Sequence, residues 1–475
     1  MPSPLYYRDA VELAALIRDR ELTAVEVMDA HLERLQALNP TLNAVVSADA
    51  DAALAAAAAA DAAQAAGTPL GALHGLPISF KDTHKTAGMV TSYGSPRHAR
   101  FIPEANDLHV QRIIDAGALR IGKTNVPEYA AGSHTTNRVF GPTRNPYDPS
   151  RSVGGSSGGA AAALAAGFQP IADGSDMGGS LRNPASFCNV VGLRPTPGLV
   201  PNADGPNGFD PLTVAGPMAR TVDDVALLLS VMARPSGRDP LGYTDPAVQT
   251  GRVTAAELCG LRVAYAPDLG GRIPVDPAVR GVIAAAAATF AAAGAHVEEA
   301  CPRLDGAEEA FRTLRAAEFF TEWGEDFAAN PEEFNHLLAW NIETGINLAG
   351  RDVLRAQAQV TTLVRAAVEF FAAYDVILAP AAQLPPFDVE LDFPHEVDGQ
   401  AQHAYLDWMR GAYLFTPLGI PGISVPGGFT AEGLPVGVQL LTRRRTDATL
   451  LSIAKAYEQA TGFARCLPAT QEVTA

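Results

Sequence analysis

Apolar residues recur three and four positions apart along the first part of the chain, the spacing of amphipathic helices. It predicts one helix over about 8–19 and a second that Thr23 begins as N-cap and Pro40 ends. A third helix is expected over about 46–66, because alanine is the best helix former and Gly67 suits the position after a helix. The chain should therefore open with helices.

Beyond residue 70, short apolar runs alternate with amphipathic stretches. The runs with β character are LPISF, ALRI, QPIAD, LRVAYAP, DVILAP, GISVP and VGVQLL. Helical spacing returns at about 107–116, 221–233, 276–293, 353–373 and 446–460. This alternation predicts an α/β fold with a mixed β-sheet core covered by helices. Since no repeat and no Ser-, Gly- or charge-rich linker divides the chain, we expect a single domain over 1–475.

Composition narrows the partners. The 475 residues are 47% hydrophobic and 18% charged, as in compact globular proteins, and the net charge of −17 argues against a nucleic-acid partner. The N-terminus shows no uninterrupted apolar run typical of a secretory signal, and the Ala-rich windows fall short of the ~18 apolar residues of a membrane span. Four cysteines without C-x-x-C spacing indicate reduced thiols. We expect a cytoplasmic protein with no membrane contact, no cofactor and no metal.

Two motif matches lack the structural context that their functions need. GALRIGKT (117–124) matches a phosphate loop, but the strand-like ALRI lies between its glycines, whereas that loop needs a strand before the first glycine. GGSSG (154–158) matches the nucleophile elbow, but the preceding RNPYDPSRSV is not a buried strand. Nucleotide binding and a Ser-His-Asp triad are therefore disfavoured.

Hydroxyls gather in two glycine-rich segments without a neighbouring histidine. GGSSGG runs into AAAALAAG, so Ser156 and Ser157 could simply cap a helix. DMGGSLRNPAS could turn several N–H groups toward one point, or could be an ordinary tight turn. In LPISFKD, Ser79 and Lys81 share one face of a strand, and Lys81 could point into solvent. Each segment alone favours the ordinary structural role.

Together, these segments resemble a known family. The order GLPISFKD, GKTNVPEYAAGSHTTNRVFGPTRNP, SVGGSSGG and GSDMGGSLRNPAS is similar to the amidase signature family of serine hydrolases. The resemblance extends from about residue 8 to the C-terminal GIPGISVPGGF and LPVGVQLL, and is strongest over 73–200. It implies an amidase-signature-like domain with N-terminal helices at about 8–66, a signature core at about 73–200 and a variable substrate-side region at about 300–400.

The resemblance also implies roles for individual residues. Ser180 would be the nucleophile, and Ser156, preceded by a cis peptide bond, would relay its proton to Lys81, which must be neutral to act as the base. Backbone N–H groups would form the oxyanion hole, from Met177, Gly178, Gly179 and Ser180. Three residues would support them: Ser157 beside Lys81, and the pair of Asp176 and Arg182 holding the loop.

Departures from the family pattern bear on the substrate. The segment WNIETGINLAGRDVLRAQAQ lacks the Arg-bearing Gly-Thr-Tyr stretch that the resemblance associates with the amidase component of the glutamyl-tRNA amidotransferase. Met177 replaces a frequent threonine, and Thr416 a frequent asparagine. We therefore expect hydrolysis of an amide, anilide or carbamate. The alternatives are the glutamine-hydrolysing component of a tRNA amidotransferase and a catalytically dead ligand-binding homologue.

The expected variable region is rich in large apolar side chains, several at helical spacing, which are more often core than pocket. They are Phe319, Phe320, Trp323, Phe327, Phe334, Leu337, Leu338 and Trp340. Because no ionic partner for a charged substrate is apparent, we expect a small neutral amide-like substrate and a chain that is a monomer or homodimer.

Overall fold

The computed structural model describes residues 4–469 and has an eight-stranded sheet at its centre. Strands β9, β7 and β8 run parallel to one another, and the other pairings in this sheet are antiparallel. The predicted mixed α/β fold is therefore confirmed. In order across the sheet, the strands are β4 (Ile171–Asp176), β6 (Val214–Ala219), β5 (Val191–Arg194), β12 (Gly422–Phe429), β13 (Pro435–Leu441), β9 (Val376–Pro380), β7 (Arg262–Tyr265) and β8 (His296–Glu299).

A three-stranded sheet lies beside β4. It consists of β1 (Val45–Ala48), β3 (Leu119–Thr124) and β2 (Pro77–Lys81), with β2 parallel and β1 antiparallel to β3. The backbone N–H of Lys81 donates to Asp173 Oδ1 at 2.9 Å, which joins the end of β2 to β4. This link brings the two strands that carry the signature motifs together. A short hairpin pairs β10 (Glu396–Val397) with β11 (Gln400–Ala401).

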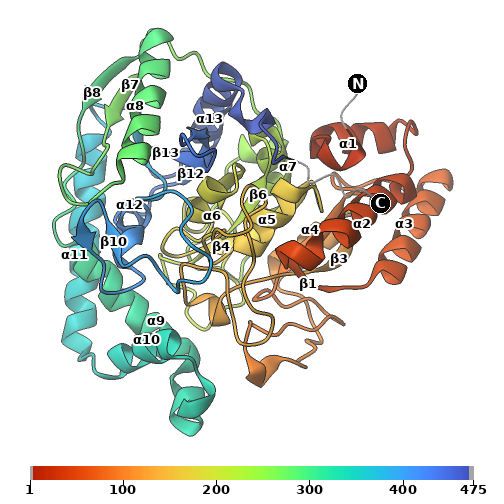
Figure 1. The fold of residues 1–475 in the computed structure, drawn as a ribbon, viewed down its shortest axis with the longest axis horizontal. Helices are drawn as coiled ribbons and strands as arrows, with labels where there is room; N and C mark the ends of the chain where they lie inside the picture. Colours follow the sequence, from red (N-terminus) through yellow and green to blue (C-terminus); the bar gives the residue numbers. More distant parts are fainter. Residues whose placement is uncertain (1–3, 470–475) are drawn as a thin grey trace.

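Helices surround the sheets, with the N-terminal group on one side and the group of the variable region on the other (Figure 1). The N-terminal group is α1 (Ala10–Arg18), α2 (Ala24–Leu42) and α3 (Ala50–Ala65). The opposite group is α9 (Ala307–Ala329), α10 (His336–Ile346) and α11 (Gly350–Phe370). The remaining helices are α4 (Leu108–Asp115), α5 (Gly158–Ala166), α6 (Arg182–Phe187), α7 (Val222–Met232), α8 (Pro277–Ala292), α12 (Arg410–Tyr413) and α13 (Asp447–Thr461).

Helix α5 explains the small residues that follow the serines. Every residue of α5 is buried, so no face of the helix is left for polar side chains. A Cβ on Gly159 would collide with the backbone of Asn125, and one on Gly158 with the side chain of Thr135. Alanine and glycine let the helix lie in the middle of the molecule, where it holds Ser156 and Ser157 at its start.

Two predicted boundaries are wrong. Helix α2 continues through Pro40 to Leu42 and ends at Asn43, whose positive φ of 52° places it in the left-handed region. Proline removes one hydrogen bond, but the N–H of Asn43 still donates to Asn39 O and closes the last turn. Residues 46–48, expected to be helical, belong to β1, because pairing with β3 outweighs local helix propensity; α3 begins only after Asp49.

Other expectations from the sequence can be compared directly with the fold. The phosphate-loop match is confirmed as accidental, since Gly122, Lys123 and Thr124 lie within β3 instead of at the start of a helix. Among residues 4–469, no helix combines the length and apolar character needed to cross a bilayer.

Candidate active site

The three residues predicted to carry the chemistry come from three separate elements. Lys81 ends β2, Ser156 precedes α5, and Ser180 lies between β4 and α6. The peptide bond between Gly155 and Ser156 is cis, as the resemblance implied. All three side chains are buried, and Ser156 and Ser180 line the same cavity of about 540 Å³.

The side chain of Lys81 points into a group of hydroxyls. Its Nζ donates to Ser156 Oγ at 2.8 Å, to Ser157 Oγ at 2.9 Å and to Ser175 Oγ at 3.0 Å. No carboxylate in residues 4–469 forms an ion pair with this amine. In the neutral amine, one of these contacts can reverse, so that the Ser156 hydroxyl donates its proton to Nζ.

Burial makes the neutral amine accessible. Lys81 is 0% exposed, and burial lowers its pKa to about 7 against the opposing influence of Asp173 and Asp176. The solvent-facing orientation that the sequence left open for Lys81 is therefore wrong. At this pKa, a substantial fraction of the amine is unprotonated near neutral pH, which a base requires.

Ser180 is the most accessible of the three residues, at 9% exposed against 1% for Ser156. In the described part of the chain, no hydrogen bond joins the two hydroxyls directly. The backbone instead couples their segments, because the N–H of Ser157 donates to Ser180 O at 3.1 Å. Ser180 is thus positioned to meet a molecule that enters the cavity.

The expected oxyanion hole is only partly free. The N–H of Gly179 donates to Asp176 Oδ1 at 2.9 Å, so this group is already engaged within the protein. The N–H groups of Met177, Gly178 and Ser180 donate to no acceptor in residues 4–469. Gly179 has a φ of +113°, a conformation that favours glycine, and its role is to form the turn.

Asp176 anchors this turn. Arg182 binds its carboxylate with two hydrogen bonds, from Nε at 3.0 Å and Nη2 at 2.9 Å, and the N–H of Leu181 donates to it at 3.1 Å. Arg194, which the sequence analysis did not select, donates to Asp176 O. Burial alone would raise the pKa of Asp176, but Arg182 and Arg194 outweigh it and hold that pKa far below its usual range.

Two contacts of Lys81 were not anticipated. Ser175 supplies a third hydroxyl, although the motif GSDMGGS contains it directly beside Asp176. Asp173 accepts the backbone N–H of Lys81, and its spacing of 92 residues from Lys81 gives no local signal. Alternation along β4 could have indicated that Asp173 and Ser175 share a face.

The cavity wall combines aromatic and charged groups. Phe319 and Trp323 of α9 line it with Tyr129, so part of the predicted aromatic stripe does face the pocket. Phe327, Phe334 and Leu338 are buried in the cluster behind it, whereas Phe320 and Trp340 are exposed. The acidic residues of the wall are Asp107, Asp204, Asp210, Glu318 and Glu322.

Comparisons with known proteins agree with this geometry. The family model described as Amidase matches residues 26–451. The acylamidase of Rhodococcus erythropolis is 36% identical over 475 residues, with 99% of each chain covered. The amidase component of the glutamyl-tRNA(Gln) amidotransferase of Thermosynechococcus vestitus is 34% identical, with 95% of this chain and 97% of that one covered. The solved structure of a bacterial aryl acylamidase of the amidase signature enzymes matches with a TM-score of 0.91 at 28% identity, covering 99% of this chain and 100% of that one. The chain therefore belongs to the amidase signature family.

Proposed function

We propose that this amidase hydrolyses the carbon–nitrogen bond of a small amide, anilide or carbamate through an acyl-enzyme on Ser180. The observation that carries the proposal is the buried amine of Lys81, 2.8 Å from Ser156 Oγ, beneath a cavity that Ser180 also lines. A serine hydroxyl is a weak nucleophile until a neighbouring base takes its proton, and this arrangement supplies one without histidine.

In the acylation step, Ser180 Oγ bonds to the substrate carbonyl carbon and its proton passes to Ser156. The proton of Ser156 passes in turn to neutral Lys81. The carbonyl oxygen becomes negative and accepts hydrogen bonds from the free N–H groups of Met177, Gly178 and Ser180. The carbon–nitrogen bond then breaks as the amine takes a proton returned from Lys81 through Ser156.

Deacylation repeats this sequence with water. Water loses a proton to the same relay and attacks the ester carbonyl, and Ser180 Oγ leaves with the returned proton as the carboxylic acid is released. Ser157 and Ser175 hold Lys81 Nζ in place, and Asp176 with Arg182 holds the turn that carries the N–H groups.

A neutral substrate with an aryl or alkyl group fits the cavity better than glutamine. Phe319, Trp323 and Tyr129 offer apolar surface, whereas the acidic side chains of the wall disfavour an α-carboxylate. The guanidinium of Arg315 also lines the cavity, but it donates to Asn341 Oδ1, Met177 Sδ and Tyr405 OH within the protein. The glutamine-hydrolysing component of an amidotransferase is the second candidate, supported by the similarity to the T. vestitus protein.

The catalytically dead alternative would need a missing nucleophile, relay or base, and each of these groups is present. Cytoplasmic location, the monomeric or homodimeric state and the single-domain organisation stay predictions of the sequence.

The experiment is a hydrolysis panel with the purified chain alone, with Ser180→Ala as the control. We expect kcat/KM for a neutral anilide or aryl amide at least about tenfold above that for glutamine, equivalent to ~1.4 kcal/mol of transition-state preference. Efficient glutaminase activity without anilide or carbamate turnover, together with copurifying partner proteins, would favour the amidotransferase function.

A further inference from the structure

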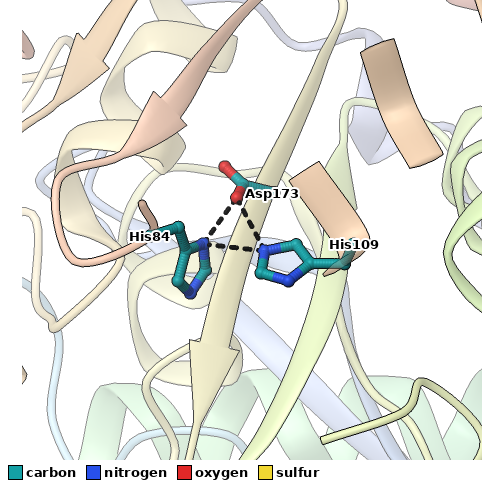
Figure 2. A group of neighbouring side chains, drawn as sticks. All are labelled: His84, His109 and Asp173. Carbon is teal, nitrogen blue, oxygen red and sulfur yellow. Dashed lines mark hydrogen bonds and ion pairs between the residues drawn. The ribbon is translucent and has the colours of Figure 1, made fainter. Parts of the chain in front are cut away.

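Two histidines and an aspartate meet beside the catalytic cavity (Figure 2). His84 lies in the loop after β2, His109 in the first turn of α4 and Asp173 in the middle of β4. His84 Nδ1 lies 2.5 Å and His109 Nε2 3.3 Å from Asp173 Oδ2, and the two nitrogens are 3.1 Å apart. Three separate elements thus direct one nitrogen or oxygen atom each toward a common point.

The triangle has the size of a metal site. A circle through the three atoms, with sides of 2.5, 3.1 and 3.3 Å, has a radius of about 1.7 Å. Zinc binds imidazole nitrogen and carboxylate oxygen at about 2.0–2.2 Å. Because this bond length exceeds the radius, a point just outside the plane of the triangle lies at bonding distance from all three atoms.

The surroundings of Asp173 favour a cation at this point. Asp173 is 0% exposed, and its ion-pair partners within residues 4–469 are the same two imidazoles. A buried carboxylate without a cation is costly. Its Oδ1 is held by the backbone N–H of Lys81, which leaves Oδ2 turned toward the histidines. Such a fixed outer hydrogen bond is typical of metal-binding carboxylates.

The site also has a route for an ion and room for a further ligand. His84 and His109 both line the cavity that contains Ser156 and Ser180. Two imidazoles and one carboxylate on one side of a cation leave its other positions free, as in three-ligand transition-metal sites.

We propose that His84, His109 and Asp173 bind one divalent transition-metal ion, for which Zn²⁺ is the best match, with its open coordination positions facing the catalytic cavity. The ion is separate from the Ser180 relay, and no step of amide hydrolysis passes through it. Local sequence patterns do not indicate this site, because His84 and His109 stand 25 positions apart outside any ligand motif.

The test is calorimetric titration of EDTA-treated, dialysed protein with Zn²⁺, supported by visible spectroscopy with Co²⁺. We expect one Zn²⁺ per chain with a Kd on the order of 1 µM or tighter. His84→Gln, His109→Gln and Asp173→Asn should each weaken binding by at least about tenfold. Asp173→Asn retains an acceptor for the Lys81 N–H, and circular dichroism confirms that each variant is folded.

The matched control is His98→Gln, which removes a half-buried imidazole that instead contacts Tyr129 OH at 3.0 Å. It should bind Zn²⁺ as the unmodified protein does. A folded protein that binds no stoichiometric Zn²⁺ has only a hydrogen-bonded cluster here, and this result overturns the proposal. Binding that survives unchanged in both His84→Gln and His109→Gln overturns it as well. Neither outcome affects the assignment of Ser180, since binding is measured without substrate.

Discussion

Lys81 Nζ and Ser156 Oγ lie 2.8 Å apart, although 75 positions separate the two residues in the chain. The contact exists because β2 lies beside β4 and the buried helix α5 starts at the same place. Full burial removes water from the amine, and the amine has hydroxyls in place of a carboxylate partner. The relationship therefore favours a lysine that exchanges protons over one that serves as a fixed charge.

Lys81→Arg should abolish turnover almost as completely as Lys81→Ala. Arginine keeps the positive charge but does not deprotonate in proteins, so it cannot take the proton of Ser156. The measurement is kcat/KM on an aryl amide, with thermal unfolding to confirm that the larger side chain is tolerated. Most of the activity remaining in a folded arginine variant would contradict a base role for Lys81.

Activity should depend on pH through Lys81. Since burial lowers its pKa from 10.5 to about 7, the neutral base is present above that pH and is lost as pH falls below it. In EDTA-treated enzyme, kcat/KM should decrease about tenfold per pH unit on the acidic side of the transition. A profile that rises only near pH 10, or that is flat between about pH 5.5 and 8.5, would show that Lys81 does not titrate as proposed.

The serines around Lys81 should differ in importance. Ser156→Ala removes the relay and should slow acylation by about 10²- to 10⁴-fold, whereas Ser180 is still present as a nucleophile. Ser157→Ala removes one of three hydrogen bonds to Lys81 and should cost about tenfold or less. Rapid-mixing acylation rates separate the two variants. Equal losses in both would mean that Ser156 only positions the amine.

Breaking the buried ion pair of the turn should destabilise the fold. Asp176→Asn leaves Arg182 and Arg194 without their carboxylate, and both are buried, so the free energy of unfolding should fall by about 3–5 kcal/mol. Equilibrium denaturation measures this change. The matched control is Glu369→Gln, which breaks the exposed pair with Arg303 and should change stability little. Similar losses in the two variants would contradict the anchoring role.

Particular residues show how far the sequence predicts the site. Lys81, Ser156, Ser157 and Ser180 were found because ordered motifs carry them, and the structure brings Lys81 to the serines as expected. Gly179 shows a limit, since the sequence could not reveal that Asp176 takes its N–H.

Contacts between distant segments were beyond the reach of local patterns. The cluster of His84, His109 and Asp173 depends on how α4 packs beside β4, and spacing along the chain does not encode this packing. The same holds for the fold: alternation of apolar runs predicted seven strands of the two main sheets, but β1 was taken for part of a helix because its pairing with β3 is not local.

Covalent trapping tests the central claim most directly. The purified chain is treated with a fluorophosphonate probe and digested, and the modified peptide is sequenced by mass spectrometry. The account predicts one label per chain on Ser180, loss of the label in Ser180→Ala, and slower labelling in Lys81→Ala with the same site. A label on Ser156, or an unmodified Ser180 in folded protein that hydrolyses an amide, would contradict it.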